Sequence, residues 1–391
     1  MSSADRLEFS GFLRPDGTFG VRNYLAVVPT VACACDVVLR VSEVVVGARP
    51  LMHHQGCAQL PQDVERVARV LANLGKNPNV GAVLVVGLGC ESVSADRLAD
   101  EISKTGKPVE TVVIQEEGGT RRAIARGVEL GQRLAVEISE CRRTSAGVSE
   151  LAVGVKCGAS DATSGIASNP AVGACSDALV DRGATVIFGE TTEIIGAEHI
   201  LAKRAASREV AERLLEVVRR TEERIRRAGV DIRGSQPTPG NIAGGITTLE
   251  EKSLGAIAKG GSRPLAGVLE YGERPEGRGL YFMDTPGREA EAVTGLVAGG
   301  AQVVLFTTGR GAPQGFPIAP VVKVCGNPRT CKLLGEHIDV DVSGVIEGGE
   351  TVEGAGRRVL GELLEVASGK PTRAELLGCD LTIEIYAGAP I

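Results

Sequence analysis

Uninterrupted apolar runs alternate with amphipathic segments along this chain, and this alternation restricts the possible folds more than any other feature. Apolar runs typical of buried strands lie at residues 24–31, 49–53, 82–88, 109–115, 151–156, 185–189, 266–270, 280–283, 302–306 and 320–323. Helical patterns are clearest at residues 60–74, 96–105, 120–140, 207–228 and 350–368. Continuous Val- and Leu-rich strands joined by helical crossovers predict an α/β fold of Rossmann-like parallel sheets with helices on both faces.

A polar segment at residues 141–150 (CRRTSAGVSE) interrupts this pattern and marks the first expected boundary. At 391 residues the chain is long enough for two or three lobes. A loop is expected at residues 234–245 (GSQPTPGNIAGG). We expect a flexible tail over residues 1–10, an N-terminal α/β domain over 11–145, a second α/β domain over 150–262 and a C-terminal α/β region over 263–391.

Composition excludes several classes of protein. With 43% hydrophobic and 24% charged residues, the chain is typical of a soluble globular protein and not of a disordered one. A net charge of -6 disfavours nucleic-acid binding. The longest uncharged stretch, residues 292–309, contains four Gly, three Thr and one Gln, so a membrane span is not expected. The polar start MSSADRLEFS is unlike a signal peptide, and we therefore expect a cytoplasmic location.

Three of the ten cysteines share one local pattern. Cys57, Cys90 and Cys157 each stand six residues after a Leu, beside a Gly, and just beyond or at the expected end of a strand. Ligands of open parallel sheets bind beyond the carboxyl ends of the strands, and thiolates select iron, iron–sulfur clusters or zinc. The three thiols are therefore candidate metal ligands, with His53 as a fourth candidate near Cys57. The alternative is that they are small residues that pack well at strand ends.

Several long blocks of sequence are more specific than any single motif. They are GFLRPDGTFGVRNYLAV (11–27), VLVVGLGCE (83–91), QEEGGTRRAI (115–124), CGASDATSGIASNPAVG (157–173), ETTEIIGAEHIL (190–201), PGNIAGGITTLEEKSLGAIAKGG (239–261), MDTPG (283–287) and LFTTGRGAPQG (305–315). Through these blocks the chain resembles the altronate dehydratase/galactarate dehydratase family of sugar-acid dehydratases from Gly11 to near Asp341.

The resemblance implies a metal-dependent lyase that removes water from a sugar acid or a related 2,3-dihydroxy acid. Members take the proton at C2, expel the C3 hydroxyl and release a 2-keto-3-deoxy acid after tautomerisation. A metal stabilises the enediolate and the departing oxygen, while an acid and a base move the protons. The implied cofactor is Fe(II) or a labile iron–sulfur cluster. Two arrangements stay open: a cluster held by Cys57, Cys90 and Cys157 with one exposed iron, or a mononuclear Fe(II) held by carboxylates and His53.

The resemblance also implies a partner. Single-chain members of the family carry a small β-rich domain before the GFLRPDG block, whereas only ten residues precede Gly11 here. The same arrangement occurs in the large subunits of two-chain members, which include sulfolactate sulfo-lyase. We therefore expect a separate small β-rich subunit, a small hydroxy acid as substrate and an oligomeric enzyme, with neither nucleic acid nor membrane as a partner. The alternatives are a (2R)-sulfolactate sulfo-lyase large subunit that releases sulfite, and a non-catalytic subunit that carries a structural metal.

The candidates for acid–base chemistry are Lys156, Asp161, Glu190, Glu193 and Lys252. Lys156 stands at a strand end, where burial would lower its pKa and make it a base, and an ion pair is the alternative. Glu190 and Glu193 follow the strand at 185–189, where metal binding, acid–base chemistry and helix capping are all open. Lys252 either faces inward from one helical turn or lies on a solvated face.

The candidates for substrate binding are Ser160, Ser164, Asn169, Thr308 and Arg310. The segment from residue 158 to 170 offers backbone amides and hydroxyls to a carboxylate or a metal, or else forms a helix cap and an Asx turn. Arg310 stands among Gly and Thr residues after a strand, which suits a bidentate grip on a substrate carboxylate. A structural turn is the alternative there.

Overall fold

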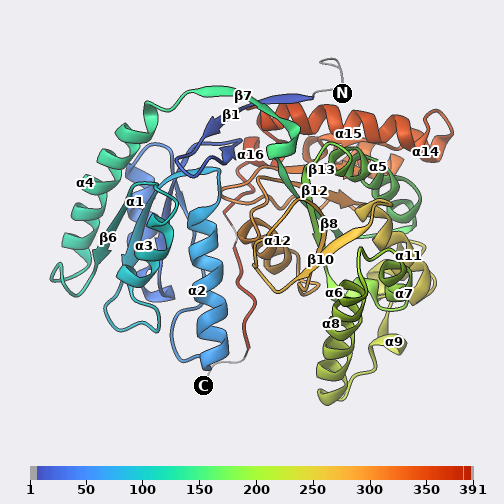
Figure 1. Ribbon diagram of the computed structural model, residues 1–391, viewed down its shortest axis with the longest axis horizontal. Helices are drawn as coiled ribbons and strands as arrows, with labels where there is room; N and C mark the ends of the chain where they lie inside the picture. Colours follow the sequence, from blue (N-terminus) through green and yellow to red (C-terminus); the bar gives the residue numbers. More distant parts are fainter. Residues whose placement is uncertain (1–6, 382, 389–391) are drawn as a thin grey trace.

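The apolar runs of the first lobe form one parallel sheet in the computed structural model, which describes residues 7–381 and 383–388. The sheet has the order β4-β3-β5-β6, with strands β3 (Tyr24–Pro29), β4 (Ala48–Pro50), β5 (Val80–Gly87) and β6 (Val109–Val113). One face packs against α1 (Cys35–Val44) and α4 (Thr120–Ser139), and the other against α2 (Pro61–Lys76) and α3 (Ala95–Ser103) (Figure 1). Every residue of β5 is buried because helices cover both faces.

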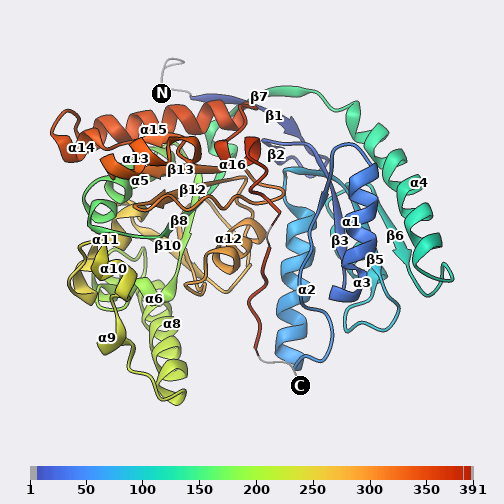
Figure 2. The ribbon, with the colours of Figure 1, turned by 180° about the vertical axis from the view of Figure 1, so that it is seen from behind.

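A second parallel sheet forms the core of the larger lobe (Figure 2). Its strand order is β10-β11-β9-β8-β12-β13-β14, and all neighbours pair in parallel. The strands are β8 (Ala152–Gly158), β9 (Thr185–Gly189), β10 (Leu265–Leu269), β11 (Gly279–Met283), β12 (Val303–Thr308), β13 (Val321–Cys325) and β14 (Val340–Asp341). The boundary expected between residues 262 and 263 therefore falls inside one continuous sheet, to which both sides contribute strands.

The polar segment at residues 141–150 carries a strand and is not an irregular linker. β7 (Arg143–Gly147) pairs antiparallel with β1 (Glu8–Leu13), which also pairs with β2 (Phe19–Gly20). This small sheet lies across the top of both lobes in Figure 1. Polar side chains hide the strand in the sequence, because the pairing satisfies backbone groups and does not require a buried face.

Buried polar contacts hold the two lobes together. Asn77, at the end of α2, donates its side-chain amide to the carbonyls of Val297 and Ala301 at 3.0 and 2.9 Å. Asn79 donates in the same way to Gln302 at 2.8 Å. Both asparagines are fully buried, and one hydrophobic cluster includes residues of both sheets. The lobes therefore pack as one body.

Helices cover both faces of the larger sheet. α5 (Asn169–Val180), α8 (Arg208–Arg227) and α15 (Val352–Ala367) share the main hydrophobic cluster, whereas α12 (Glu289–Ala298) packs on the face towards the first lobe. The remaining helices are α6 (Thr191–Ile194), α7 (Glu198–Lys203), α9 (Ile232–Ser235), α10 (Pro239–Ala243), α11 (Leu249–Ile257), α13 (Pro328–Leu333), α14 (Gly344–Glu347) and α16 (Arg373–Leu376). The segment expected to be a loop at 234–245 thus contains α10 and the end of α9. Within the described residues, no helix combines the length and the apolar character needed to span a membrane.

The strand order reverses beside β8. From β8 the chain runs through β9, β10 and β11 on one side of that strand and returns to β12 on its other side. The loops that follow β8 and β12 meet there, and the Gly309 amide donates to the Ala159 carbonyl at 3.3 Å. Such a switch point at the carboxyl edge is where open α/β sheets bind ligands.

Candidate active site

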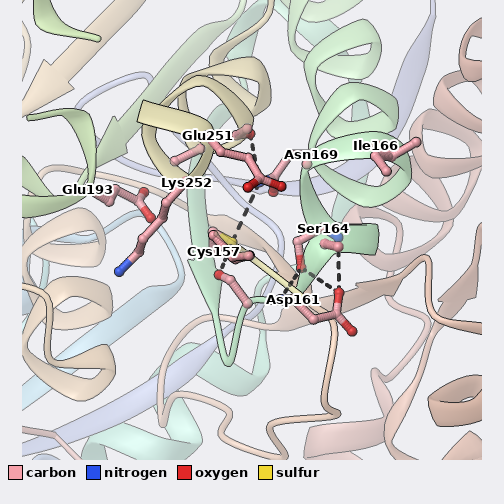
Figure 3. Close-up of a pocket in the computed structure, with 14 residues that line it drawn as sticks. Cys157, Asp161, Ser164, Ile166, Asn169, Glu193, Glu251 and Lys252 are labelled. Atoms are coloured by element: carbon pink, nitrogen blue, oxygen red, sulfur yellow. Dashed lines mark hydrogen bonds between the residues drawn. The ribbon is translucent and has the colours of Figure 1, made fainter. Parts of the chain in front are cut away.

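A pocket of about 150 Å³ opens where β8 ends (Figure 3). Its walls come from the loop after β8, the π-helical segment η4 (Ser164–Ser168), the start of α5, and the helices α6 and α11. The polar side chains that line it are those of Cys157, Ser160, Asp161, Ser164, Asn169, Glu193, Glu251 and Lys252. All except Glu251 are residues that the sequence proposes for a site, so the fold brings most of the candidates into one place.

Cys157 lies at the centre of the labelled side chains in Figure 3, at the end of β8. Its thiol is held by polar neighbours: the Ser160 hydroxyl is 2.8 Å from the sulfur, and the Asn169 amide donates at 3.6 Å. Asn169 also donates to the Gly255 carbonyl at 2.9 Å and accepts from the Thr307 hydroxyl at 2.6 Å. These contacts fix the pocket floor, since Asn169 bridges β12, α5 and α11.

Asp161 caps the helical segment that follows it. One carboxylate oxygen accepts from the Ser164 amide at 3.1 Å and from the Thr163 hydroxyl at 2.6 Å. The other oxygen accepts from the Asn327 side chain at 2.7 Å. Asp161 therefore acts as a helix cap. It lines the pocket, but both of its carboxylate oxygens already accept hydrogen bonds. Two residues earlier, Ala159 has φ of 48°, a strained conformation of a kind that clusters at functional sites.

Glu193 and Lys259 form a buried ion pair at one side of the pocket. The Lys259 ammonium donates to the Glu193 carboxylate, and the two side chains are 0% and 3% exposed, respectively. Of the two, Glu193 lines the pocket, while Lys259 lies behind it in the turn that follows α11. Burial lowers the pKa of Lys259 to about 8.

Lys156 and Glu190 pair behind the pocket and do not line it. The Lys156 ammonium donates to the Glu190 carboxylate and to the Cys157 carbonyl. Burial opposes the charge of Lys156, but the Glu190 carboxylate outweighs burial and raises its pKa above the usual value. Lys156 is therefore a charged ion-pair partner of Glu190 and not a free base. Glu190 has φ of 79°, a second strained residue at a strand end of this edge.

Lys252 reaches the pocket from α11 and is its candidate base. Its ammonium donates to the Gln236 side chain at 2.8 Å, and no carboxylate of the described residues pairs with it. Burial lowers its pKa below the usual value. Figure 3 draws Lys252 on the same side of the pocket as Glu193, opposite Asp161 and Ser164. The neighbouring Glu251 instead accepts from the amide and the hydroxyl of Thr247, at 2.8 and 2.5 Å, and stabilises the helix start.

Thr308 and Arg310 both follow β12 but lie in different surroundings. Thr308 is buried, and its hydroxyl accepts from two backbone amides of the next turn at 3.0 and 3.2 Å, so it stabilises the loop. Arg310 is exposed and donates to the Gly240 carbonyl at 3.3 Å. It lines a second pocket that adjoins the first at Asp161.

The residues expected to hold iron do not form one group. Cys57 and Cys90 are exposed in loops after β4 and β5 of the smaller sheet, whereas Cys157 ends a strand of the larger sheet. His53 is buried, and its ring nitrogens contact a backbone carbonyl at 2.8 Å and a backbone amide at 3.2 Å. Across residues 7–381 and 383–388, no three His, Cys, Asp or Glu side chains lie close enough to hold a metal. The expected donor set therefore does not fit a metal in this structure.

Sequence reasoning misses Lys259, Asn327 and Arg329, which contact or line the two pockets. Lys259 carries a signal: it is a single charge inside an apolar, Gly-rich run (GAIAKGG), and a lysine in such a run is buried only when it is paired. Asn327 and Arg329 carry no comparable signal, because polar residues after a strand are common in surface loops.

The geometry suits proton transfer on a small anionic molecule. Lys252, with its lowered pKa, and Glu193, the carboxylate of the buried ion pair, line the same pocket, as general acid–base catalysis requires. The hydroxyl of Ser160 lines its wall and offers a hydrogen bond to an oxygen atom, whereas the hydroxyl of Ser164 is bonded to Asp161.

Known protein families match nearly the whole chain. A profile described as D-galactarate dehydratase/altronate hydrolase, second domain, matches residues 11–139, and one described as D-galactarate/altronate dehydratase, C-terminal, matches residues 148–388. The chain is 42% identical to (2R)-sulfolactate sulfo-lyase subunit beta of Chromohalobacter salexigens, over 95% of each chain. It is 35% identical to altronate dehydratase of Bacillus subtilis, over 94% of this chain and 75% of that protein. It is also 35% identical to galactarate dehydratase (L-threo-forming) of Escherichia coli, over 98% of this chain and 77% of that protein.

Proposed function

The chain belongs to the D-galactarate/altronate dehydratase family, and on that premise we propose that it is a lyase that removes water from a sugar acid or a related 2,3-dihydroxy acid. The product is a 2-keto-3-deoxy acid. One observation carries the proposal: a single pocket joins Lys252 with the Glu193–Lys259 pair at the carboxyl edge of a parallel sheet. These groups supply the base and the acid that the reaction needs.

Lys252 takes the proton from C2 of the substrate. Its pKa lies below the usual value because the side chain is partly buried, and this increases the fraction of the neutral amine near neutral pH. The electrons of the C2–H bond pass to the carboxylate and form an enediolate.

The Glu193–Lys259 pair protonates the leaving group. The C3–O bond breaks with its electrons on oxygen, and the hydroxyl takes the proton of the pair and leaves as water. The remaining enol takes a proton at C3 and becomes the 2-keto acid. Ser160 lines the opposite wall and binds an oxygen atom of the substrate, while Ser164 and Asn169 hold the loop and the floor in place.

A sulfo-lyase is the second candidate, because the relative of that name matches over 95% of both chains. In that reaction the C–S bond breaks at C3 instead of the C–O bond, and sulfite leaves as an anion. Sulfite needs no proton to leave, whereas hydroxide does. The role of the Glu193–Lys259 pair therefore separates the two reactions.

The test is turnover of a panel of acids: altronate, galactarate and (2R)-sulfolactate. Released 2-keto acid is measured as its phenylhydrazone, and released sulfite by its reaction with a disulfide reagent. We expect 2-keto acid from a dihydroxy acid, without sulfite. Sulfite release would favour the second candidate, and no 2-keto acid from any of the three would contradict both.

We also propose that a small β-rich subunit completes the enzyme, since the matching sulfo-lyase chain is itself named as a subunit. Turnover by the chain alone, equal to turnover with such a subunit added, would contradict this. Iron, as Fe(II) or a labile cluster, is proposed as the cofactor on the family resemblance alone, and anaerobic purification with iron and sulfide analysis tests it. Cell fractionation tests the expected cytoplasmic location.

A further inference from the structure

The second pocket lies next to the first at the carboxyl edge of the larger sheet. Its volume is about 460 Å³, and its lining includes Asp161, Gly244, Arg310, Asn327, Arg329 and Thr330. Asp161 lines both pockets, so they share a wall. A ligand whose reacting end occupies the first pocket therefore has its other end beside the second.

Two guanidinium groups line this pocket without a carboxylate partner. Arg310 follows β12 and Arg329 belongs to α13, and both are exposed. Among the residues that the structure describes, no Asp or Glu forms an ion pair with either of them. The Gly240 carbonyl engages one donor of Arg310 at 3.3 Å, which leaves the other N–H groups of the fork available.

Asp161 lines the same pocket, but its oxygens are engaged by other partners. Its oxygens accept from the Thr163 hydroxyl, the Ser164 amide and the Asn327 side chain. Gly309 also approaches this carboxylate so closely that a Cβ there would lie 2.2 Å from its carboxyl carbon. Within the described residues Asp161 forms no ion pair with either arginine, and a lining with two arginines and one carboxylate keeps a net positive charge for a ligand.

The sheet places this pocket at the strand-order reversal. Asp161 follows β8, Arg310 follows β12 and Asn327 follows β13, three neighbouring strands that lie around that point. Ligands of open α/β sheets bind in the crevice at such a point. The first pocket lies beside it and carries the acid–base groups, so the two pockets divide the site into a reacting end and a distal end.

We propose that Arg310 and Arg329 bind a second acidic group, so that the substrate is a hydroxy acid with anionic groups at both ends. This inference rests on the proposed function and narrows its substrate class. A guanidinium fork matches a planar carboxylate in a bidentate manner and also accepts the oxygens of a sulfonate. A monoacid with a terminal hydroxymethyl group leaves both charges unsatisfied. The distal group is thus a carboxylate or a sulfonate, and not an alcohol.

Binding of inert analogues tests the inference without turnover. Titration calorimetry compares 2-hydroxyglutarate, which is acidic at both ends, with 2-hydroxypentanoate, which has one acidic group at nearly the same length. A third ligand, 2-hydroxy-4-sulfobutanoate, carries a distal sulfonate. We expect the diacids to bind about tenfold more tightly or better, as one or two charge-assisted hydrogen bonds provide. Equal affinities, or no binding of either diacid, would overturn the inference.

Variants assign the preference to the two arginines. In Arg310→Gln and Arg329→Gln, we expect the ratio of diacid to monoacid affinity to fall towards one, whereas Arg121→Gln, on an exposed face of α4, keeps the wild-type ratio. A preference that survives in the double variant would overturn the assignment. The ratio between the carboxylate and sulfonate ligands identifies the distal group. A diacid preference without turnover of any panel substrate would contradict the proposed function and leave this inference standing.

Discussion

The carboxylate of Glu193 faces the pocket, while its ion-pair partner Lys259 is completely buried behind it. A substrate that contacts Glu193 therefore meets a group whose protonation is governed by a lysine out of reach. Burial lowers the pKa of Lys259 to about 8, closer to neutral pH than the pKa of an exposed lysine. Lys259 is in this sense a positioning residue.

Lys259→Met removes the cation beside Glu193 and leaves a buried carboxylate without its partner. Burial then raises the pKa of Glu193, so we expect the pH dependence of kcat to shift and kcat to fall by about 100-fold or more, with a smaller change in KM. The pH profile distinguishes this from simple unfolding. The exposed Lys203→Met serves as the control and keeps the wild-type profile. A profile unchanged in Lys259→Met would show that the pair takes no part in proton transfer.

The pH dependence of the wild-type enzyme reports on Lys252. A base acts in its neutral form, and burial lowers the pKa of this lysine below its usual value of 10.5. We therefore expect kcat/KM to rise with pH and to level off at a pH below that value. Initial rates measured between pH 6 and pH 10, in buffers of constant ionic strength, check this. A steady fall of kcat/KM over the same range would argue against an amine base.

Gly309→Ala tests the close approach of the loop after β12 to the loop after β8. A Cβ at this position would lie 2.2 Å from both the carboxyl carbon and one oxygen of Asp161, which other hydrogen bonds hold in place. We expect the substitution to cost about 1–3 kcal/mol of unfolding free energy and to impair turnover. Gly361→Ala is the matched control, since its Cβ would meet open space in α15. Similar denaturation midpoints for the two variants would contradict the predicted clash.

The contact between Arg22 and Glu375 connects the first lobe to the C-terminal segment. The two side chains are 9% and 11% exposed, and their closest atoms are 2.9 Å apart. Removing one partner of such a buried pair costs about 3–5 kcal/mol, so we expect Glu375→Ala to lower the unfolding free energy by that amount. Chemical denaturation at pH 7 measures it.

The same pair predicts how stability depends on pH. Burial works to raise the pKa of Glu375, but Arg22 outweighs burial and lowers it below the usual value of 4.5. A carboxylate with a lowered folded-state pKa contributes stability that is present above its unfolded pKa and is lost as the pH falls through the folded value. The difference in stability between wild type and Glu375→Ala should therefore shrink below pH 4.5. A difference that is constant down to pH 3 would contradict this assignment.

Much of the fold follows from hydrophobic patterning alone. The strand at 185–189 is observed as β9 with the same ends, and the charged helix at 207–228 is observed as α8, Arg208–Arg227. Both are set by local periodicity. β7 cannot be predicted in this way, because Arg143, Thr144 and Ser145 show no alternation of apolar and polar residues. Its partner strand β1 also lies more than a hundred residues earlier in the sequence.

The site residues, too, are only partly predictable from local sequence patterns. The repeated Cys pattern correctly marks strand ends, but a local pattern does not say which sheet a strand joins. Cys57 and Cys90 therefore follow strands of one sheet, whereas Cys157 lies at the end of a strand of the other sheet. The other residues that line the pocket around Cys157 lie in the sequence blocks that carry the family resemblance, and the fold brings these blocks together. Lys259 and Arg329 reach the site through packing of distant segments, which one sequence does not reveal.

The cysteines themselves give a further prediction. Cys57 and Cys90 are exposed and follow strands of the smaller sheet, whereas Cys157 lies in the larger sheet. We therefore expect Cys57→Ser and Cys90→Ser to retain turnover and any bound iron. Iron analysis of anaerobically purified protein, with Cys379→Ser as the control, checks this. Loss of iron from both variants would show that thiols of the two lobes act together as ligands.

Turnover by Lys252→Met, measured beside wild type on the same hydroxy acid, tests the proposed chemistry most directly. Lys252 lines the pocket, its pKa is lowered by burial, and it removes the C2 proton in the proposed reaction. General-base catalysis contributes about 100- to 10,000-fold, so release of 2-keto acid should fall by that factor while the variant keeps its fold by circular dichroism. Release within twofold of wild type would contradict the assignment of Lys252 as the base.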